Sequence, residues 1–261
     1  MAARLFPDTL SVARDGGAVD GKRSDQPACK PRWLITGDGS RFVGKLVGEP
    51  SSLTGSVSPL RALTEFAAAH WAVAFGVHAP ESRFLDFDGE LWIGSRALAS
   101  PRPASPAAVA AVTPPEAVSG LLALDVFIGN HDRHDGNVLF VPEHEGGSAL
   151  RLFAIDHERS AMGLQDIEED FTETYAAVTM FHAVLRPAVR RSAAVAAARQ
   201  ARVVLGQDDR LRFPLISGNM WCKVDISLLA SMEAVLAARL ERLANLVDVV
   251  CGLDPIPWTP S

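Results

Sequence analysis

Residues 129–140 constrain the fold of this chain more than any other segment, and they read Gly-Asn-His-Asp-Arg-His-Asp-Gly-Asn-Val-Leu-Phe. Asp132 precedes Asn137 by five positions, and the apolar run that follows Asn137 predicts a strand. A Gly-rich turn and a second apolar run, Leu150–Ile155, predict the returning strand, which ends at Asp156. The sequence therefore predicts a hairpin with polar residues before its first strand and a carboxylate after its second.

These polar residues match the requirements of phosphoryl transfer from ATP. That reaction uses one carboxylate to orient the attacking hydroxyl, and an amide and a second carboxylate to hold magnesium. Asp132 suits the first role, and Asn137 and Asp156 suit the second, because Mg²⁺ prefers hard oxygen ligands. Taken singly, each is also a common turn-capping residue, but their combined spacing favours catalysis. Three roles are open for His134: it steadies the loop, contacts a phosphate or shares in proton transfer.

Two further candidates lie upstream. Lys45 is in the predicted strand Arg41–Val47, between two valines of the same face, as expected for a lysine that reaches ATP phosphates from the roof of a pocket. The alternative is a surface lysine. Glu65 is in the predicted helix Leu60–Phe75 and is a candidate partner of Lys45, as in kinases. The alternative is a glutamate on a solvated helix face.

Local signals predict the remaining elements of the first half. Trp33–Thr36 and the strand after the turn at 37–40 form one hairpin, and Asp88-Gly89 is the turn of another. Residues 86–89, Asp-Phe-Asp-Gly, look like a kinase metal motif, but they precede the catalytic loop and are interpreted as this turn. Gly76 is placed to end the helix before it.

The chain divides into four parts. Residues 1–30 are predicted to be a mobile leader with room for one early strand, and residues 31–98 a β-rich N-lobe that forms the nucleotide roof. Residues 99–115 hold five prolines and are predicted to be a linker or covering loop, since proline disfavours helix and sheet alike. Residues 116–261 contain the catalytic hairpin and then a helical C-lobe. The fold class is thus α+β, with two lobes.

Composition narrows the classes of function. The net charge of −6 and the lack of a basic block disfavour nucleic acid as a partner. The three cysteines, Cys29, Cys222 and Cys251, are widely spaced, which disfavours disulfides and zinc and suits a reducing cytosol. The N-terminus lacks a signal-peptide pattern, and no run of eighteen apolar residues predicts a membrane span. We expect a cytoplasmic protein without membrane contact.

The pattern Gly-Asn-x-Asp-x-His-x-x-Asn, with Lys45 upstream and Asp156 downstream, resembles the HipA-like kinases, in particular the short domains found outside full toxin–antitoxin proteins. Residues 132–137 are also similar to the catalytic loop of phosphoinositide kinases. The resemblance implies a two-lobed protein-kinase-like fold and a protein Ser/Thr kinase that uses ATP and Mg²⁺. It implies Asp132 as catalytic base, Asn137 and Asp156 as magnesium ligands, and Lys45 as the phosphate lysine.

This chain departs from the kinase pattern at the metal motif, which reads Asp156-His157-Glu158 where kinases have Asp-Phe-Gly. No clear Gly-rich phosphate loop is present; residues 21–24 and 37–40 are both candidates. The acceptor is expected to be a protein Ser or Thr, with a lipid or small-molecule kinase as the alternative. A metallophosphoesterase is a further alternative, because residues 129–132, Gly-Asn-His-Asp, match one element of that class, and a non-catalytic pseudokinase is another.

Overall fold

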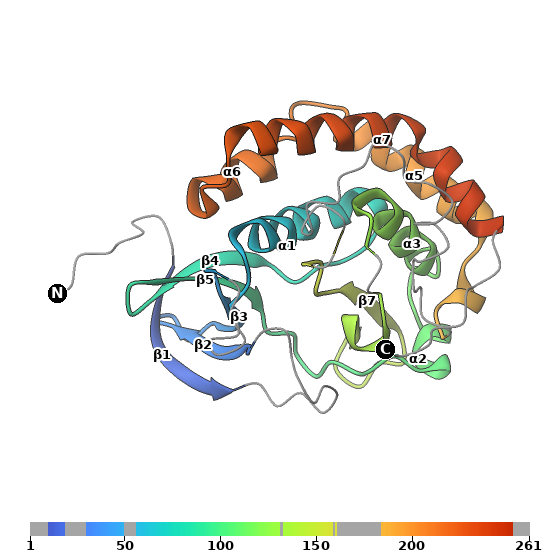
Figure 1. Cartoon of the computed structure of the whole chain (residues 1–261). Helices are drawn as coiled ribbons and strands as arrows, with labels where there is room; N and C mark the ends of the chain where they lie inside the picture. The colour runs from blue at the N-terminus through green and yellow to red at the C-terminus, as the bar shows by residue number, and fades with distance from the viewer. Residues whose placement is uncertain are drawn as a thin grey trace, which may run out of the picture.

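The computed structural model describes residues 10–18, 30–49, 56–130, 133–158, 160 and 184–252. In chain order it has a small β-barrel, a two-stranded hairpin and a group of C-terminal helices (Figure 1). The helix α1 (Pro59–Trp71) lies between the barrel and those helices, in contact with both. This arrangement confirms the predicted α+β class, with a β-rich N-terminal part and a mainly helical remainder.

The barrel is closed by a strand that local signals barely reveal. Its strands are β1 (Leu10–Ala18), β2 (Arg32–Thr36), β3 (Arg41–Leu46), β4 (Ser82–Phe87) and β5 (Glu90–Arg96). Neighbours follow the order β1-β2-β3-β5-β4, and β1 returns to pair with β4 in parallel. The early strand anticipated in the leader is therefore β1, and it belongs to the barrel.

The barrel has its own apolar interior, separate from the main core. Leu34, Phe42, Leu85 and Trp92 are all buried there. Gly44 and Gly94 pair across β3 and β5, and a Cβ at Gly94 would lie 2.5 Å from a methyl carbon of Leu85. Side chains fill the interior because these two glycines leave room for them.

The two hairpins predicted in the first half are confirmed. The strands β2 and β3 pair around residues 37–40, and β4 and β5 pair around Asp88-Gly89. Asp88 and Gly89 have φ of 54° and 79°, the left-handed conformations that a tight two-residue hairpin turn requires. The Asp-Phe-Asp-Gly segment is thus a turn, as interpreted from its position.

The predicted helix over residues 60–75 is confirmed as α1 followed by the 3₁₀ helix η1 (Ala72–Phe75). Ser58 caps it by accepting a hydrogen bond from the Arg61 amide, and Pro59 occupies the first turn, where its missing N–H is harmless. Gly76 ends it with φ of 70°, the left-handed conformation expected of a glycine there.

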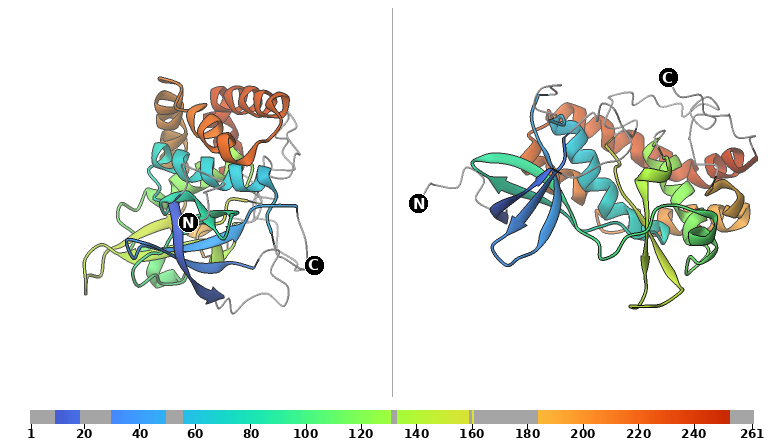
Figure 2. Two further views of the ribbon diagram at one scale, coloured as in Figure 1. Left: turned by 90° about the vertical axis from the view of Figure 1, so that its left-hand side faces the viewer. Right: turned by 90° about the horizontal axis from the view of Figure 1, so that it is seen from below.

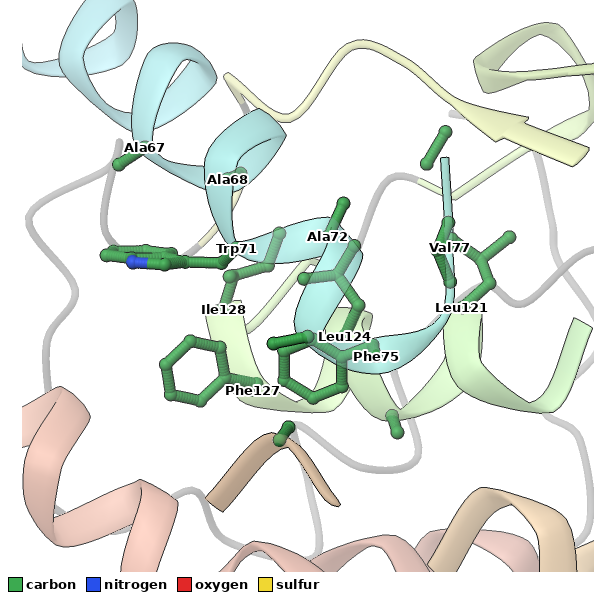
Figure 3. Close-up of a cluster of buried hydrophobic side chains, with 14 of the residues drawn as sticks. Ala67, Ala68, Trp71, Ala72, Phe75, Val77, Leu121, Leu124, Phe127 and Ile128 are labelled. Carbon is green, nitrogen blue, oxygen red and sulfur yellow. The ribbon is translucent and has the colours of Figure 1, made fainter. Parts of the chain in front are cut away.

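The main core lies where α1 and η1 meet α3 (Ala117–Ile128), whose residues are all buried. Trp71 and Phe75 each lie 5.5 Å from the ring of Phe127, measured between ring centroids. Small alanines alternate with these large rings (Figure 3). This packing fixes α3, and with it the loop that follows α3, relative to the N-terminal part.

Gly120→Ala is expected to destabilise the protein by about 1–3 kcal/mol. A Cβ at this position would clash with the backbone carbonyl oxygen of Phe75, which cannot move aside as a flexible side chain can. Thermal unfolding followed by circular dichroism measures the loss. Gly37→Ala is the matched control, because nothing lies within 4 Å of a Cβ there. Equal melting temperatures for the two variants would show that α3 and η1 are not packed this closely.

The proline-rich segment 99–115 is more ordered than predicted. The helix α2 (Pro106–Ala110) interrupts it, so the prediction that proline denies helix there is wrong for these five residues. Ser105 caps the helix by accepting from the Ala108 amide, and proline in the first turn loses no helical hydrogen bond. Bridges from Arg102 to Phe140 and from Val112 to Leu150 bring the segment alongside the hairpin.

The hairpin and the C-terminal helices complete the fold (Figure 2). The hairpin consists of β6 (Val138–Pro142) and β7 (Leu150–Ala154), as predicted. The helical elements after it are η4 (Arg186–Ala188), α5 (Arg191–Leu205), α6 (Phe213–Cys222) and α7 (Ile226–Gly252). Residues 161–183 of the predicted helical stretch lie outside the described residues.

The helix α5 packs on α3 and α7, and α6 packs on α1. No helix in the described part of the chain combines the length and the apolarity that crossing a membrane requires.

Candidate active site

The hairpin places Asn137 next to Asp156. The 3₁₀ turn η2 (Asp135–Asn137) leads directly into β6, and Val138 pairs with Ala154 of β7. One position further out, the amide of Ile155 donates to the carbonyl of Asn137 at 3.2 Å. The two predicted magnesium ligands therefore leave the same end of the hairpin. Their amide and carboxylate oxygens suit a Mg²⁺ ion that phosphates would hold on its other side.

No three His, Cys, Asp or Glu side chains among the described residues surround a common position where a metal could bind. Asp132, the predicted catalytic base, lies outside the described residues, as does His131. The two residues that frame this gap, Asn130 and Arg133, are both buried. The ends of the loop that carries Asp132 are therefore anchored in the protein interior.

Arg133 is the main anchor of this loop. Its guanidinium donates to both carboxylate oxygens of Asp125, at 2.8 and 3.0 Å, and to the carbonyls of Asn137 and Ile155, at 2.6 and 2.8 Å. Both charged side chains are fully buried. The arginine thus connects α3 to the backbone of Asn137, a predicted metal ligand, and to that of Ile155, the residue before the other one.

Sequence reasoning missed this ion pair. The available signal was Asp125, a lone charge in the otherwise apolar run Leu121–Ile128. Buried carboxylates are nearly always paired, so an aspartate there required a cation nearby. Asn130 contributes to the same cluster, since its side-chain amide donates to Asp125 at 2.9 Å.

His157 completes the buried cluster. Its Nδ1 accepts from Arg133 at 3.1 Å, and burial, together with the charge of Arg133, lowers its pKa to about 3. The ring is therefore neutral and carries its proton on Nε2. That nitrogen is buried and has no hydrogen-bond partner among the described residues.

Lys45 reaches from the barrel to the hairpin end. Its ammonium donates to Asp156 Oδ1 and to Glu158 Oε2, both at 2.8 Å. Asp156 lies 111 positions and Glu158 lies 113 positions after Lys45 in the sequence. The fold thus brings the predicted phosphate lysine to the predicted metal ligand. Lys45 is only 14% exposed, so the alternative of a solvated surface lysine does not describe it.

Asp156 and Glu158 differ in exposure and in protonation behaviour. Burial alone would raise the pKa of Asp156, but the charge and hydrogen bond of Lys45 outweigh it, and the pKa is lowered. Burial raises the pKa of Glu158 despite the same lysine. Asp156 has a left-handed backbone, with φ of 59°, and its side chain is 38% exposed. The carboxylate that could bind a metal is thus the accessible one.

Glu65 is buried and lies in the same cluster, so it is not on a solvated helix face. One of its carboxylate oxygens accepts a short hydrogen bond from the backbone amide of His157. Burial raises the pKa of Glu65, and the nearby charge of Lys45 opposes that rise. The structure therefore brings Glu65, Lys45 and Asp156 into one cluster and adds Glu158, which sequence reasoning did not select. The predicted pairing of Glu65 with Lys45 is present only as an interaction between charges, because the hydrogen bond of Glu65 goes to the backbone of His157.

His134 is exposed, and its ring Nδ1 accepts from the Gly136 amide at 3.0 Å. It caps the turn η2, which agrees with the first of its three predicted roles, that of steadying the loop. Its part in proton transfer stays a prediction.

The turn at residues 37–40 does not suit a phosphate. The Asp38 carboxylate accepts from the Thr36 hydroxyl and from the amide and hydroxyl of Ser40, and these bonds lower its pKa to about 2. A fixed negative charge inside the turn repels an anion. The other candidate, residues 21–24, lies outside the described residues.

A cavity of about 430 Å³ lies elsewhere, between the end of β3, the start of β5 and the end of α6. None of Lys45, Glu65, Asn137, Asp156 or Glu158 lines it.

Comparison with known proteins identifies the fold. No protein-family model and no curated protein sequence matches the chain. Among solved structures, the proinflammatory kinase CtkA of Helicobacter pylori is similar, with a TM-score of 0.57 and 10% identity over 92% of this chain and 96% of that one. The chain therefore has the two-lobed protein-kinase-like fold predicted for it.

Two more distant structures are also similar. HipA of Shewanella oneidensis MR-1, solved with HipB and operator DNA, has a TM-score of 0.44 and 15% identity over 74% of this chain and 58% of its own. An aminoglycoside phosphotransferase of Alicyclobacillus acidocaldarius has a TM-score of 0.34 and 14% identity over 97% of this chain and 98% of its own.

Proposed function

We propose that this protein is a HipA-like kinase that transfers the γ-phosphate of Mg²⁺–ATP to a Ser or Thr hydroxyl of a protein. The observation that carries the proposal is the contact of Lys45 with Asp156, beside Asn137, on a protein-kinase-like fold. In kinases the lysine of the β-rich lobe and the metal-binding aspartate act on the same nucleotide phosphates, so the two side chains must lie close together, as Lys45 and Asp156 do.

In this proposal each residue acts on a defined group. Asn137 and Asp156 hold Mg²⁺, which supplies positive charge to the β- and γ-phosphates. With the metal on Asp156, the ammonium of Lys45 would be available to bind the phosphates. Asp132 orients the acceptor hydroxyl and takes its proton as the hydroxyl oxygen bonds to the γ-phosphorus. The bond from that phosphorus to the β-phosphate oxygen breaks, and ADP leaves.

The metallophosphoesterase alternative is disfavoured by Asn130. In that reading, Asn130 and Asp132 would face a pair of metals. Asn130 instead is fully buried and donates to Asp125, and its backbone amide bonds to the carbonyl of the same residue. Its amide oxygen is therefore not displayed toward solvent, where a substrate would arrive.

Mg²⁺–ATP at millimolar concentration is expected to raise the melting temperature, because a ligand that binds only the native state stabilises it, by about 2.7 kcal/mol at 100 times Kd. Differential scanning fluorimetry measures the shift, with ATP plus EDTA as the control for metal dependence. Absence of any shift with metal present would contradict a nucleotide-binding role.

The proposed transfer is tested by intact-mass spectrometry after incubation with Mg²⁺–ATP, with Asp132→Asn as the control. Each autophosphorylation event adds one phosphate, and residues 51–58 hold five hydroxyl residues. Of these, Ser56 is buried and donates to the Glu49 carbonyl, and Ser58 caps α1, so the sites are expected at Ser51, Ser52 or Thr54, which lie outside the described residues. Label that enters only lipids or small metabolites would favour the alternative acceptors.

A further inference from the structure

Glu158, which pairs with Lys45, occupies a sequence position where kinases have no side chain. Lys45 donates to Glu158 at 2.8 Å, and Glu158 is the third residue of the segment Asp156-His157-Glu158. In the Asp-Phe-Gly motif of kinases this position is a glycine, which has no side chain to offer. The departure from the motif thus supplies a carboxylate directly to Lys45.

The helix glutamate is engaged elsewhere in the same segment. Glu65, in α1, accepts from the backbone amide of His157. Glu65 therefore holds the main chain at His157. Lys45 donates to the side chains of the two residues that flank His157, Asp156 and Glu158. The charge of Glu65 still acts on Lys45 through space, since the lysine opposes the rise in the pKa of Glu65.

The two carboxylates that hold Lys45 are not equivalent. The side chain of Asp156 is 38% exposed and that of Glu158 is 5% exposed. A metal ion that arrives with nucleotide from solvent meets Asp156, whereas Glu158 is enclosed by protein. When a metal takes Asp156, Glu158 still accepts from Lys45 among the residues that the structure describes.

We propose that Glu158 is the positioning residue for Lys45, which keeps the ammonium aimed at the nucleotide phosphates once Asp156 has bound the metal. This inference rests on the proposed function, and it assigns to Glu158 the part that the helix glutamate plays in kinases, with Glu65 as the anchor of the segment backbone.

The test is a double-mutant cycle on Mg²⁺–ATP affinity, measured by isothermal titration calorimetry. Glu158→Gln preserves the shape of the side chain and removes its charge, so Kd for Mg²⁺–ATP is expected to rise about tenfold, as for loss of a charge-assisted hydrogen bond. Because Glu158 acts through Lys45, adding Glu158→Gln to Lys45→Met is expected to cause no further loss. Glu143→Gln, which removes a carboxylate paired with the half-exposed Arg151, is the matched control and should bind as wild type.

A conservative variant separates charge from packing. Glu158→Asp keeps the charge on a side chain one methylene shorter, so it is expected to recover most of the affinity that the Gln variant loses. If Glu158→Gln does not fold, Glu158→Asp replaces it in the double-mutant cycle. The smaller loss of Mg²⁺–ATP affinity that Glu158→Asp causes is then expected to disappear when Lys45→Met is also present.

Wild-type affinity in Glu158→Gln, or losses that multiply in the double variant, would overturn the assignment while leaving the proposed function intact. A wild-type protein that binds no Mg²⁺–ATP would overturn the proposed function itself, and this assignment with it.

Discussion

Arg133→Met is expected to destabilise the protein by about 3–5 kcal/mol, the cost of removing one partner from a buried ion pair. Asp125 would be left as an uncompensated charge inside α3, and the carbonyls of Asn137 and Ile155 would each lose a donor. Chemical denaturation with urea measures the free energy of unfolding. Such a loss of unfolding free energy is among the largest that a single substitution causes, since native proteins are stable by only about 5–15 kcal/mol.

Two variants frame that measurement. Arg151→Met removes the exposed partner of Glu143 and should cost less than about 1 kcal/mol, as surface ion pairs do. The double variant Asp125→Leu with Arg133→Met removes both buried charges and is expected to recover part of the stability, but not all, because the Ile155 carbonyl and the side-chain amide of Asn130 each lose a hydrogen-bond partner. If Arg133→Met unfolds no more easily than Arg151→Met, the buried pair does not hold the catalytic loop.

The second large effect is a separation between chemistry and binding. Asp132→Asn is expected to lower phosphate transfer by about 10²–10⁴-fold, the usual contribution of a general base, and to leave Mg²⁺–ATP affinity largely unchanged. Asp156→Asn is expected to weaken metal-dependent nucleotide binding by at least about 10- to 100-fold, which is the loss seen when a metal ligand loses only its supporting partner.

The measurement pairs calorimetry of Mg²⁺–ATP binding with the rate of mass gain in intact-mass spectrometry. Asp86→Asn is a suitable control, since this aspartate belongs to the turn that only looks like a metal motif, where it accepts from the Gly89 amide. Equal loss of ATP affinity in the Asp132 and Asp156 variants would show that the two roles are misassigned.

Several elements of the site follow from short stretches of sequence. The hairpin that ends in Asp156, the turn at Asp88-Gly89 and the helix that ends at Gly76 all depend on contacts within a few residues. Apolar periodicity, turn residues with left-handed conformations and helix capping act over that range, so they are legible in the sequence. The order of these elements predicted a β-rich part followed by a helical one, and the resemblance to HipA-like kinases implied the protein-kinase-like fold.

The partners of Lys45 illustrate what the sequence did not determine. A helix glutamate, Glu65, was the natural candidate, and it does lie in the cluster, but its hydrogen bond goes to a backbone amide. The hydrogen bond between Lys45 and Glu158 depends on how the segment after β7 packs against the barrel. The two residues are 113 positions apart in the sequence. Side-chain pairing over such a separation leaves no periodic signal.

The sequence by itself determined the order of the strands and helices, because local propensity and turn geometry act within each segment, and it supplied the candidate residues for the chemistry. Only the tertiary structure decided that β1 closes the barrel against β4, that Arg133 is buried on Asp125, and that Lys45 lies between Asp156 and Glu158. The physical reason is burial. Charges and strand edges that are removed from water need hydrogen-bond or ion-pair partners, and the packed fold determines which partners lie close enough.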